Sequence, residues 1–228
     1  DLLEAVLNRF EEDDSAYTTL VQRLSAMVGR KGQPSEIRSL LKRAANIDSK
    51  EGNAWQAPVL KGLADGIKSN ELSNTDYRTE QTALIKAFFQ HPSAAIRKAS
   101  LQLLQKIGLS EGLVKVTAIQ RAKKNIQNHK LAENSRAEAL DFLALGNPTQ
   151  DSVLLKELIV PSEPLSVQQA ALQTLSAIPG LTVSEYVLEQ WQLMTPNVRS
   201  SALKTFLNNS NRIELLLDAI ESGKIEKT

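Results

Sequence analysis

The chain repeats one residue spacing four times, and this repeat constrains the fold more than any single residue does. The four copies begin at Ile96, Ser135, Val167 and Val198, and each places a small residue beside a leucine on its fifth and sixth positions. Their second positions are 39, 32 and 31 residues apart (97 to 136, 136 to 168, 168 to 199). A looser copy begins at Trp55. A period of this length predicts helix pairs stacked in an array.

The repeated positions have a physical role in such a stack. A small residue lets two helix backbones approach closely, and the leucine beside it fills the groove between layers. We therefore expect a packing motif here and no catalytic, cofactor-binding or metal-binding residue. The positions expected to build the layers are Ile96, Arg97, Leu101, Arg136, Ala139, Leu140, Ala171, Leu172, Val198, Arg199, Ala202 and Leu203.

Apolar residues recur at helical spacing along nearly the whole chain, and glycines and prolines separate the stretches. The spacing predicts helices over 78–90 with 93–107, 110–128 with 133–145, 150–159 with 166–177 and 183–193 with 197–208, and a last helix from near Arg212. An earlier helix is expected to end at Gly29 and Gly32, and Ser93, Ser166 and Asn197 are expected N-caps. We predict one all-α domain over residues 1–228, an α-α superhelix of about five or six helix pairs. Residues 69–77, polar and without periodicity, are the candidate seam.

Composition narrows the function classes only a little. The net charge is +1, so the chain as a whole has no electrostatic pull toward nucleic acid or an anionic membrane. It has no cysteine, which excludes disulfides, thiolate metal sites and covalent haem attachment within these residues. No run of about 18 apolar residues is present, so no direct membrane insertion is expected.

The repeats resemble HEAT repeats, whose second helix typically reads Asp-x-x-Val-Arg-x-x-Ala…Leu. The copy at Val198-Arg199 matches this pattern well, the copies at Arg97 and Arg136 match in part, and the third copy has Gln168 in place of the arginine. The aspartate before the motif is missing here, which puts the usual Asp–Arg ladder in question. The resemblance implies a HEAT- or armadillo-like solenoid, a class that serves as scaffold and interaction module.

The order of segments is similar to one particular family. The stretches AMVGRKGQPSEIRSLLKRA, AWQAPVLKGLADGI and LLLDAIESGKI, with the repeats between them, resemble the HEAT region of large bacterial haem-binding putative membrane-bound dehydrogenases. That region lies between a β-propeller dehydrogenase domain and a C-terminal cytochrome c domain. The resemblance implies a non-catalytic spacer in the periplasm, flanking domains as partners, and haem held in a neighbouring domain. We expect the natural chain to continue past Thr228 into that cytochrome.

The polar clusters favour structural roles. Glu11-Glu12-Asp13-Asp14 lacks the alternating ligands and glycine of a calcium loop, so a solvated helix end is expected. His91 and His129 are expected at helix ends, on the surface or as caps, because haem or metal ligation needs a second partner nearby. Trp55 and Trp191 fall on apolar stripes, which favours burial over a ligand platform.

Two alternatives remain open from the residues. A stand-alone adaptor would bind a peptide or partner domain in its concave groove and show an exposed apolar stripe there. A glycosylase-type DNA-binding protein, as in HEAT-like alkylpurine-DNA glycosylases, would use basic clusters such as Arg121, Lys123 and Lys124, or Arg38, Lys42 and Arg43. Nearby acids balance these clusters, so we expect no nucleic-acid partner.

Overall fold

The computed structural model describes residues 2–9, 15–47, 54–68, 77–207 and 209–225, and this part of the chain contains helices and no strand. The predicted all-α solenoid class is confirmed. The helices are α1 (Leu2–Leu7), α2 (Ser15–Lys31), α3 (Pro34–Ala44), α4 (Gln56–Gly66), α5 (Arg78–Gln90), α6 (Ala94–Ile107), α7 (Leu113–Gln127), α8 (Glu133–Leu143), α9 (Ser152–Glu157), α10 (Leu165–Ser176), α11 (Thr182–Gln190), the 3-10 turn η2 (Trp191–Leu193), α12 (Pro196–Phe206) and α13 (Ser210–Glu221).

The chain forms two compact units, Asp1–Val116 and Thr117–Thr228, so the division falls inside α7. The seam expected at 69–77 lies outside the described residues except for Tyr77. A stacked array can contain two compact units and still unfold as one, so the single-domain prediction stays a prediction.

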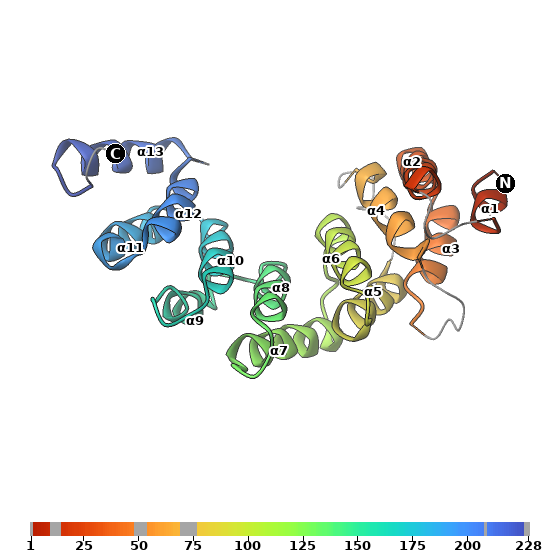
Figure 1. Ribbon diagram of the computed structural model, residues 1–228, viewed down its shortest axis with the longest axis horizontal. Helices are drawn as coiled ribbons and strands as arrows, with labels where there is room; N and C mark the ends of the chain where they lie inside the picture. Colours follow the sequence, from red (N-terminus) through yellow and green to blue (C-terminus); the bar gives the residue numbers. More distant parts are fainter. Residues whose placement is uncertain (1, 10–14, 48–53, 69–76, 208, 226–228) are drawn as a thin grey trace. The chain divides into compact units, whose positions relative to one another are not determined.

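In the first unit the second helix of each pair packs on the second helix of the next. α2 packs on α4 and α4 on α6, while α1, α3 and α5 pack beside them (Figure 1). The pattern of apolar residues at helical spacing produces this arrangement, because each helix turns one stripe toward its partner and another toward the next layer. The largest fully buried side chains of this unit are Ile37, Leu41, Leu60, Leu63, Leu84, Leu103 and Leu104.

The contact between α2 and α4 is made by backbone. A Cβ atom placed on Gly62 would overlap the carbonyl oxygen of Gln22 and lie 2.7 Å from the Cβ of Ser25. A Cβ on Gly66 would lie 2.9 Å from the Cα of Ala26. Two glycines four residues apart share one helix face, so the two helices meet without side chains between them.

The second unit repeats the row with α8, α10 and α12, and α9, α11 and α13 pack against it (Figure 1). Its core is one apolar cluster that runs from Ile126 in α7 to Ile225 after α13. Large side chains fill it, including Phe206 and Leu140, which are fully buried, and Trp191. Here the layers are separated by side chains, as in an ordinary helix stack.

Most of the predicted layer positions lie in the interior. Of the twelve positions, nine are buried, while Arg97, Arg199 and Leu203 are half-buried, and Leu203 packs against the core cluster. The helix expected over 110–128 forms α7.

Two predicted N-caps are wrong, and one predicted helix end is right in part. α2 continues through Gly29, because Gly29 faces α4, where a close approach needs it, and the helix ends at Lys31, directly before the expected Gly32. Ser166 and Asn197 lie inside α10 and α12 and are not N-caps. Pro164 precedes α10, and Pro196 occupies the first turn of α12, where its fixed φ suits the start of a helix.

Candidate functional site

The second position of every repeat donates hydrogen bonds to backbone carbonyls at the end of the preceding helix or in the linker after it. In the first unit, the Nε2 of Gln56 lies 2.9 Å from the carbonyl oxygen of Asn46, just after α3. The guanidinium of Arg97 lies 3.0 Å from the carbonyl oxygen of Pro92 and 3.2 Å from that of His91, just after α5. Carbonyl oxygens at and just after a helix end have no partner within the helix, so these side chains satisfy them. We call this interaction the helix-end clamp.

Of the described arginines that make such clamps, Arg136 is the most buried. It is 2% exposed, and its Nε lies 2.7 Å from the carbonyl oxygen of Ile126 in the last turn of α7. Its two terminal nitrogens lie 2.7 and 3.0 Å from the two carboxylate oxygens of Glu163, in the linker before α10. A two-point pair of this kind fixes both groups in one geometry. Arg136 therefore joins its own repeat to the next one.

The other two clamps of the second unit use the same position. Gln168, which replaces the arginine, donates from Nε2 to the carbonyl oxygen of Glu163 at 2.7 Å. Arg199 donates from Nε to the carbonyl oxygen of Trp191 at 2.9 Å, and its guanidinium lies 5.7 Å from the centre of that indole ring. An amide can therefore take the role of the guanidinium, and the clamp is retained without the arginine.

Arg212, at the start of α13, is a clamp that the repeat pattern did not reveal. Its guanidinium donates to the carbonyl oxygens of Ser176 and Gly180 at 3.0 Å, of Thr205 at 3.2 Å, and of Ile178. These carbonyls lie at the ends of α10 and α12 and in the loop after α10. The only sequence signal is an arginine in the first turn of an amphipathic helix.

The two histidines lie at helix ends, as predicted. His91 is 5% exposed, and its Nδ1 accepts a hydrogen bond from the backbone N–H of Ser93 at 3.1 Å. Burial, and secondarily the positive charge of Arg97, lowers the pKa of His91 below its ordinary value of 6.5. The side chain of His129 is 73% exposed, with Nδ1 3.8 Å from the Oε1 of Glu163.

Metal-ligand clusters are not found in the described ranges, where no three His, Asp or Glu side chains come together as a metal would need. The acidic run Glu11–Asp14 lies outside these ranges. In the same ranges, no helix combines the length and apolar character needed to cross a membrane. The expected absence of a cofactor or metal in this segment stays a prediction.

The basic clusters are engaged in separate local contacts. In α3, Arg43 forms an ion pair with Glu4 at 3.1 Å. In α7, Lys123 forms one with Asp151 at 2.5 Å. The expectation that the chain binds no nucleic acid stays a prediction, since these contacts do not test it.

The two tryptophans differ in burial. Trp191 is buried, as predicted, whereas Trp55 is half-buried at the start of α4. The guanidinium of Arg43 lies 5.7 Å from the centre of the Trp55 ring, as Arg199 does from that of Trp191. An aromatic face under a guanidinium is a stabilising contact in both units.

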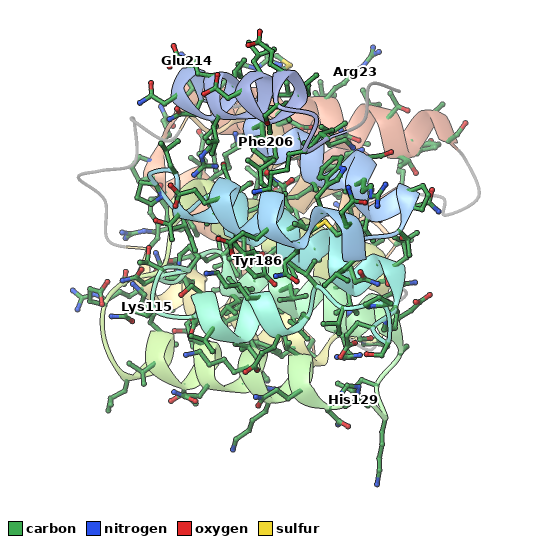
Figure 2. All side chains as sticks on the ribbon, turned by 90° about the vertical axis from the view of Figure 1, so that its left-hand side faces the viewer. Arg23, Lys115, His129, Tyr186, Phe206 and Glu214 are labelled. Atoms are coloured by element: carbon green, nitrogen blue, oxygen red, sulfur yellow. The ribbon has the colours of Figure 1, made fainter. Side chains whose placement is uncertain are left out.

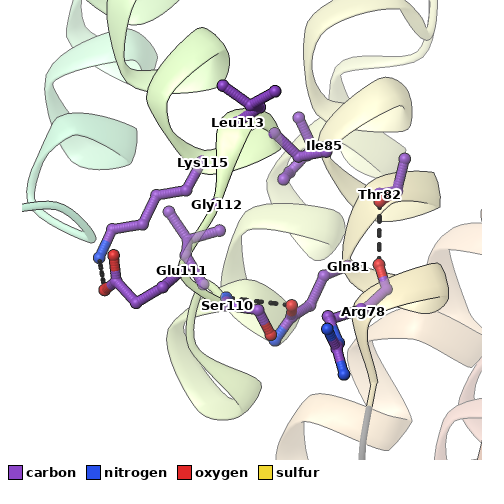
Figure 3. A pocket seen from close by; sticks show the side chains of 11 residues that line it. Arg78, Gln81, Thr82, Ile85, Ser110, Glu111, Gly112, Leu113 and Lys115 are labelled. Atoms are coloured by element: carbon purple, nitrogen blue, oxygen red, sulfur yellow. Dashed lines mark hydrogen bonds and ion pairs between the residues drawn. The ribbon is translucent and has the colours of Figure 1, made fainter.

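A small hollow of about 240 Å³ lies between α5 and the turn that leads into α7 (Figure 3). Gln81 accepts a hydrogen bond from the backbone N–H of Ser110 at 3.1 Å, and Glu111 pairs with Lys115 at 2.6 Å on the rim. Leu113 lies beside it and is 85% exposed. Gln81 and the pair of Glu111 with Lys115 thus hold the turn, and no nucleophile–base pair is among the residues that line the hollow.

No protein-family model matches the chain, and neither a curated protein nor a solved structure matches it. The resemblance to HEAT repeats and to the dehydrogenase region therefore stays a prediction that rests on the quoted segments.

Proposed function

We propose that this chain is a non-catalytic scaffold whose stacked helix pairs hold neighbouring domains at a reproducible separation. The observation that carries the proposal is the helix-end clamp, which occurs at the same position of all five motif copies. A clamp fixes the linker between two helices to the second helix, and the linkers are where a helix stack bends most easily. Polar side chains of the repeat are thus used to stiffen the stack.

The resemblance supplies a setting for this scaffold. On that basis, the chain is a periplasmic spacer between a propeller dehydrogenase and a cytochrome c, and the haem belongs to the cytochrome. Electron transfer between two redox centres requires that they approach in a reproducible way. A stack of clamped helices supports such a role through position alone, and its partners are the flanking domains.

A distance measurement tests the scaffold role. The chain has no native cysteine, so two introduced cysteines can carry spin labels without competing sites. Arg23→Cys in α2 and Glu214→Cys in α13 replace exposed residues near the two ends, both labelled in Figure 2. We expect a narrow distribution of the distance between the labels.

Removing clamps should broaden that distribution. Arg97→Ala and Arg199→Ala each delete donors to linker carbonyls, whereas Lys204→Ala removes an exposed cation of α12 and is the matched control. The scaffold role is wrong if the unmodified chain already gives a broad distribution. It is also wrong if the clamp variants, with their helix content unchanged, leave the distribution as narrow as the control does.

A further inference from the structure

The outer side of α2 carries apolar side chains that no described element covers. Ser25, Ala26 and Gly29 form the side of α2 that meets α4. Elsewhere on the same helix, Leu20 is 41% exposed and Met27 is 62% exposed. These are large apolar side chains in a helix whose opposite side is tightly packed, so their exposure calls for an explanation.

Helix geometry places this exposed stripe directly opposite the contact with α4. At about 100° per residue, Leu20, Leu24 and Met27 fall within about 60° of one another around the axis of α2. Their mean direction lies about 180° from that of Ser25, Ala26 and Gly29 by the same count. α4 has helices on both sides, α2 on one and α6 on the other (Figure 1). α2 is the last helix of this row: α1 packs beside it, and Leu20 and Met27 stay exposed on the face where a further helix layer would stack.

The stripe ends in an open hollow. The last two turns of α2 and the first turn of α3 surround a depression of about 700 Å³, lined by Met27, Val28, Arg30, Lys31 and Glu36. Val28 is half-buried and gives the hollow an apolar floor beside Met27. A depression of this kind accepts a large apolar side chain from a docked helix.

The positive charge of α2 indicates which kind of helix would dock on it. α2 contains Arg23, Arg30 and Lys31 and no acidic residue. Arg23 points away from the ribbon into solvent (Figure 2), and the ion pair of Lys31 with Glu36, 3.1 Å long, is exposed. A second copy of this chain, docked through the same face, would place cations against cations. A helix with carboxylates beside its apolar stripe would instead find complementary charge.

We propose that the outer face of α2 is a docking surface for an amphipathic helix whose apolar stripe is flanked by Asp and Glu residues. The docked helix extends the row of α2, α4 and α6 by one layer. This inference rests on the proposed scaffold function and names one of its partner surfaces. The distance measurement tests the scaffold role independently, since its outcome does not depend on what binds α2.

Two synthetic peptides test the proposal against the full chain. Both carry leucines at helical spacing on one face, and the flanking positions are glutamate in one and lysine in the other. With fluorescently labelled peptides, anisotropy should show that the glutamate peptide binds at least about tenfold more tightly, and that added salt weakens it. Met27→Glu should weaken this binding by about tenfold or more, because it places a negative charge in the hollow, which repels the glutamates of the peptide.

A charge reversal and a control make the test specific. Arg30→Glu with Lys31→Glu changes exposed residues only and should reverse the preference toward the lysine peptide. Leu193→Glu alters an equally exposed leucine in the second unit and should change nothing. Equal affinity for both peptides, or full binding by the Met27 variant, would overturn the proposal. So would a dimer in sedimentation that Met27→Glu dissociates, because a second copy would then be the occupant.

Discussion

Neighbouring helix layers contact each other differently in the two units. In the first, α2 and α4 meet backbone to backbone, and the approach depends on the missing side chains of Gly62 and Gly66. In the second, bulky side chains such as Phe206 separate the layers, and the guanidinium groups of Arg136 and Arg212 hold them by reaching carbonyl oxygens of other helices. One repeat pattern therefore tolerates two kinds of layer contact. The stability of the first unit should therefore fall when a side chain is enlarged at the α2–α4 contact. The stability of the second should fall when a buried side chain is shortened.

The largest effect is expected for Arg136→Met. The substitution leaves the carboxylate of Glu163 without its two-point partner and the carbonyl of Ile126 without its donor. Removing one member of a buried ion pair costs about 3–5 kcal/mol of unfolding free energy. Arg199→Met is the matched control: it loses uncharged acceptors only and should cost about 1–2 kcal/mol. Urea unfolding measures the free energy of unfolding of both variants. Equal losses would show that the ion pair with Glu163 contributes nothing to stability.

Core truncation in the second unit should come next. Leu140→Ala and Leu172→Ala occupy the same repeat position beside Ala139 and Ala171, and both leucines are buried. Each should destabilise by about 2–5 kcal/mol, as buried leucine truncations do. Leu193→Ala, at an exposed leucine, is the control and should change stability little. Unchanged urea midpoints for both buried positions would contradict the repeat register.

Adding one methyl group should damage the first unit. Gly66→Ala forces the new Cβ against the backbone of Ala26 and should cost about 1–3 kcal/mol or more. Gly146→Ala is the matched control in the second unit, where the nearest atom is the movable end of the Ile119 side chain at 2.9 Å. This substitution should lower the free energy of unfolding by less than about 1 kcal/mol. Hydrogen exchange would show that the destabilisation by Gly66→Ala is confined to α2 and α4. Equal destabilisation by the two substitutions would contradict the proposed difference between the units.

The smallest effect is a pH dependence confined to the first unit. Because the pKa of His91 is lowered in the folded protein, the unfolded chain binds its proton more readily. The stability that neutral His91 contributes is complete above about pH 6.5 and decreases as the pH falls below that value. Urea midpoints between about pH 7.5 and about pH 5 should therefore fall less in His91→Asn than in the unmodified chain. His129→Asn, at an exposed position, is the control, and identical slopes for both variants would contradict the assignment.

Periodicity predicted the helices well because it reports which side of each helix is buried. The predicted ranges 78–90 and 93–107 correspond closely to α5 and α6. The positions of Leu140 and Leu172 in the interior also followed from the repeat. These features are local, since each depends on residues three or four apart on one helix.

The features that the sequence did not reveal depend on long-range partners. The two-point pair of Arg136 joins residues 27 apart, and Glu163 does not occupy the expected aspartate position of the motif. Arg212 reaches a carbonyl 36 residues before it. Gly29 looked like a helix end because glycine is a weak helix former, and only the position of α4 explains why it lies inside α2. Tertiary contacts overrode local propensity in each case.

The helix-end clamps also bear on how such an array can gain or lose repeats in evolution. The clamps of Gln56 and Arg97 lie within single helix pairs, so duplicating or deleting such a pair leaves no carbonyl end without its donor. Arg136 and Arg212 reach into a neighbouring pair instead. Removing the pair that follows Arg136, or the one that precedes Arg212, would strand a buried guanidinium. The first unit is therefore free to change in length by whole repeats, whereas the second is constrained to keep its present order.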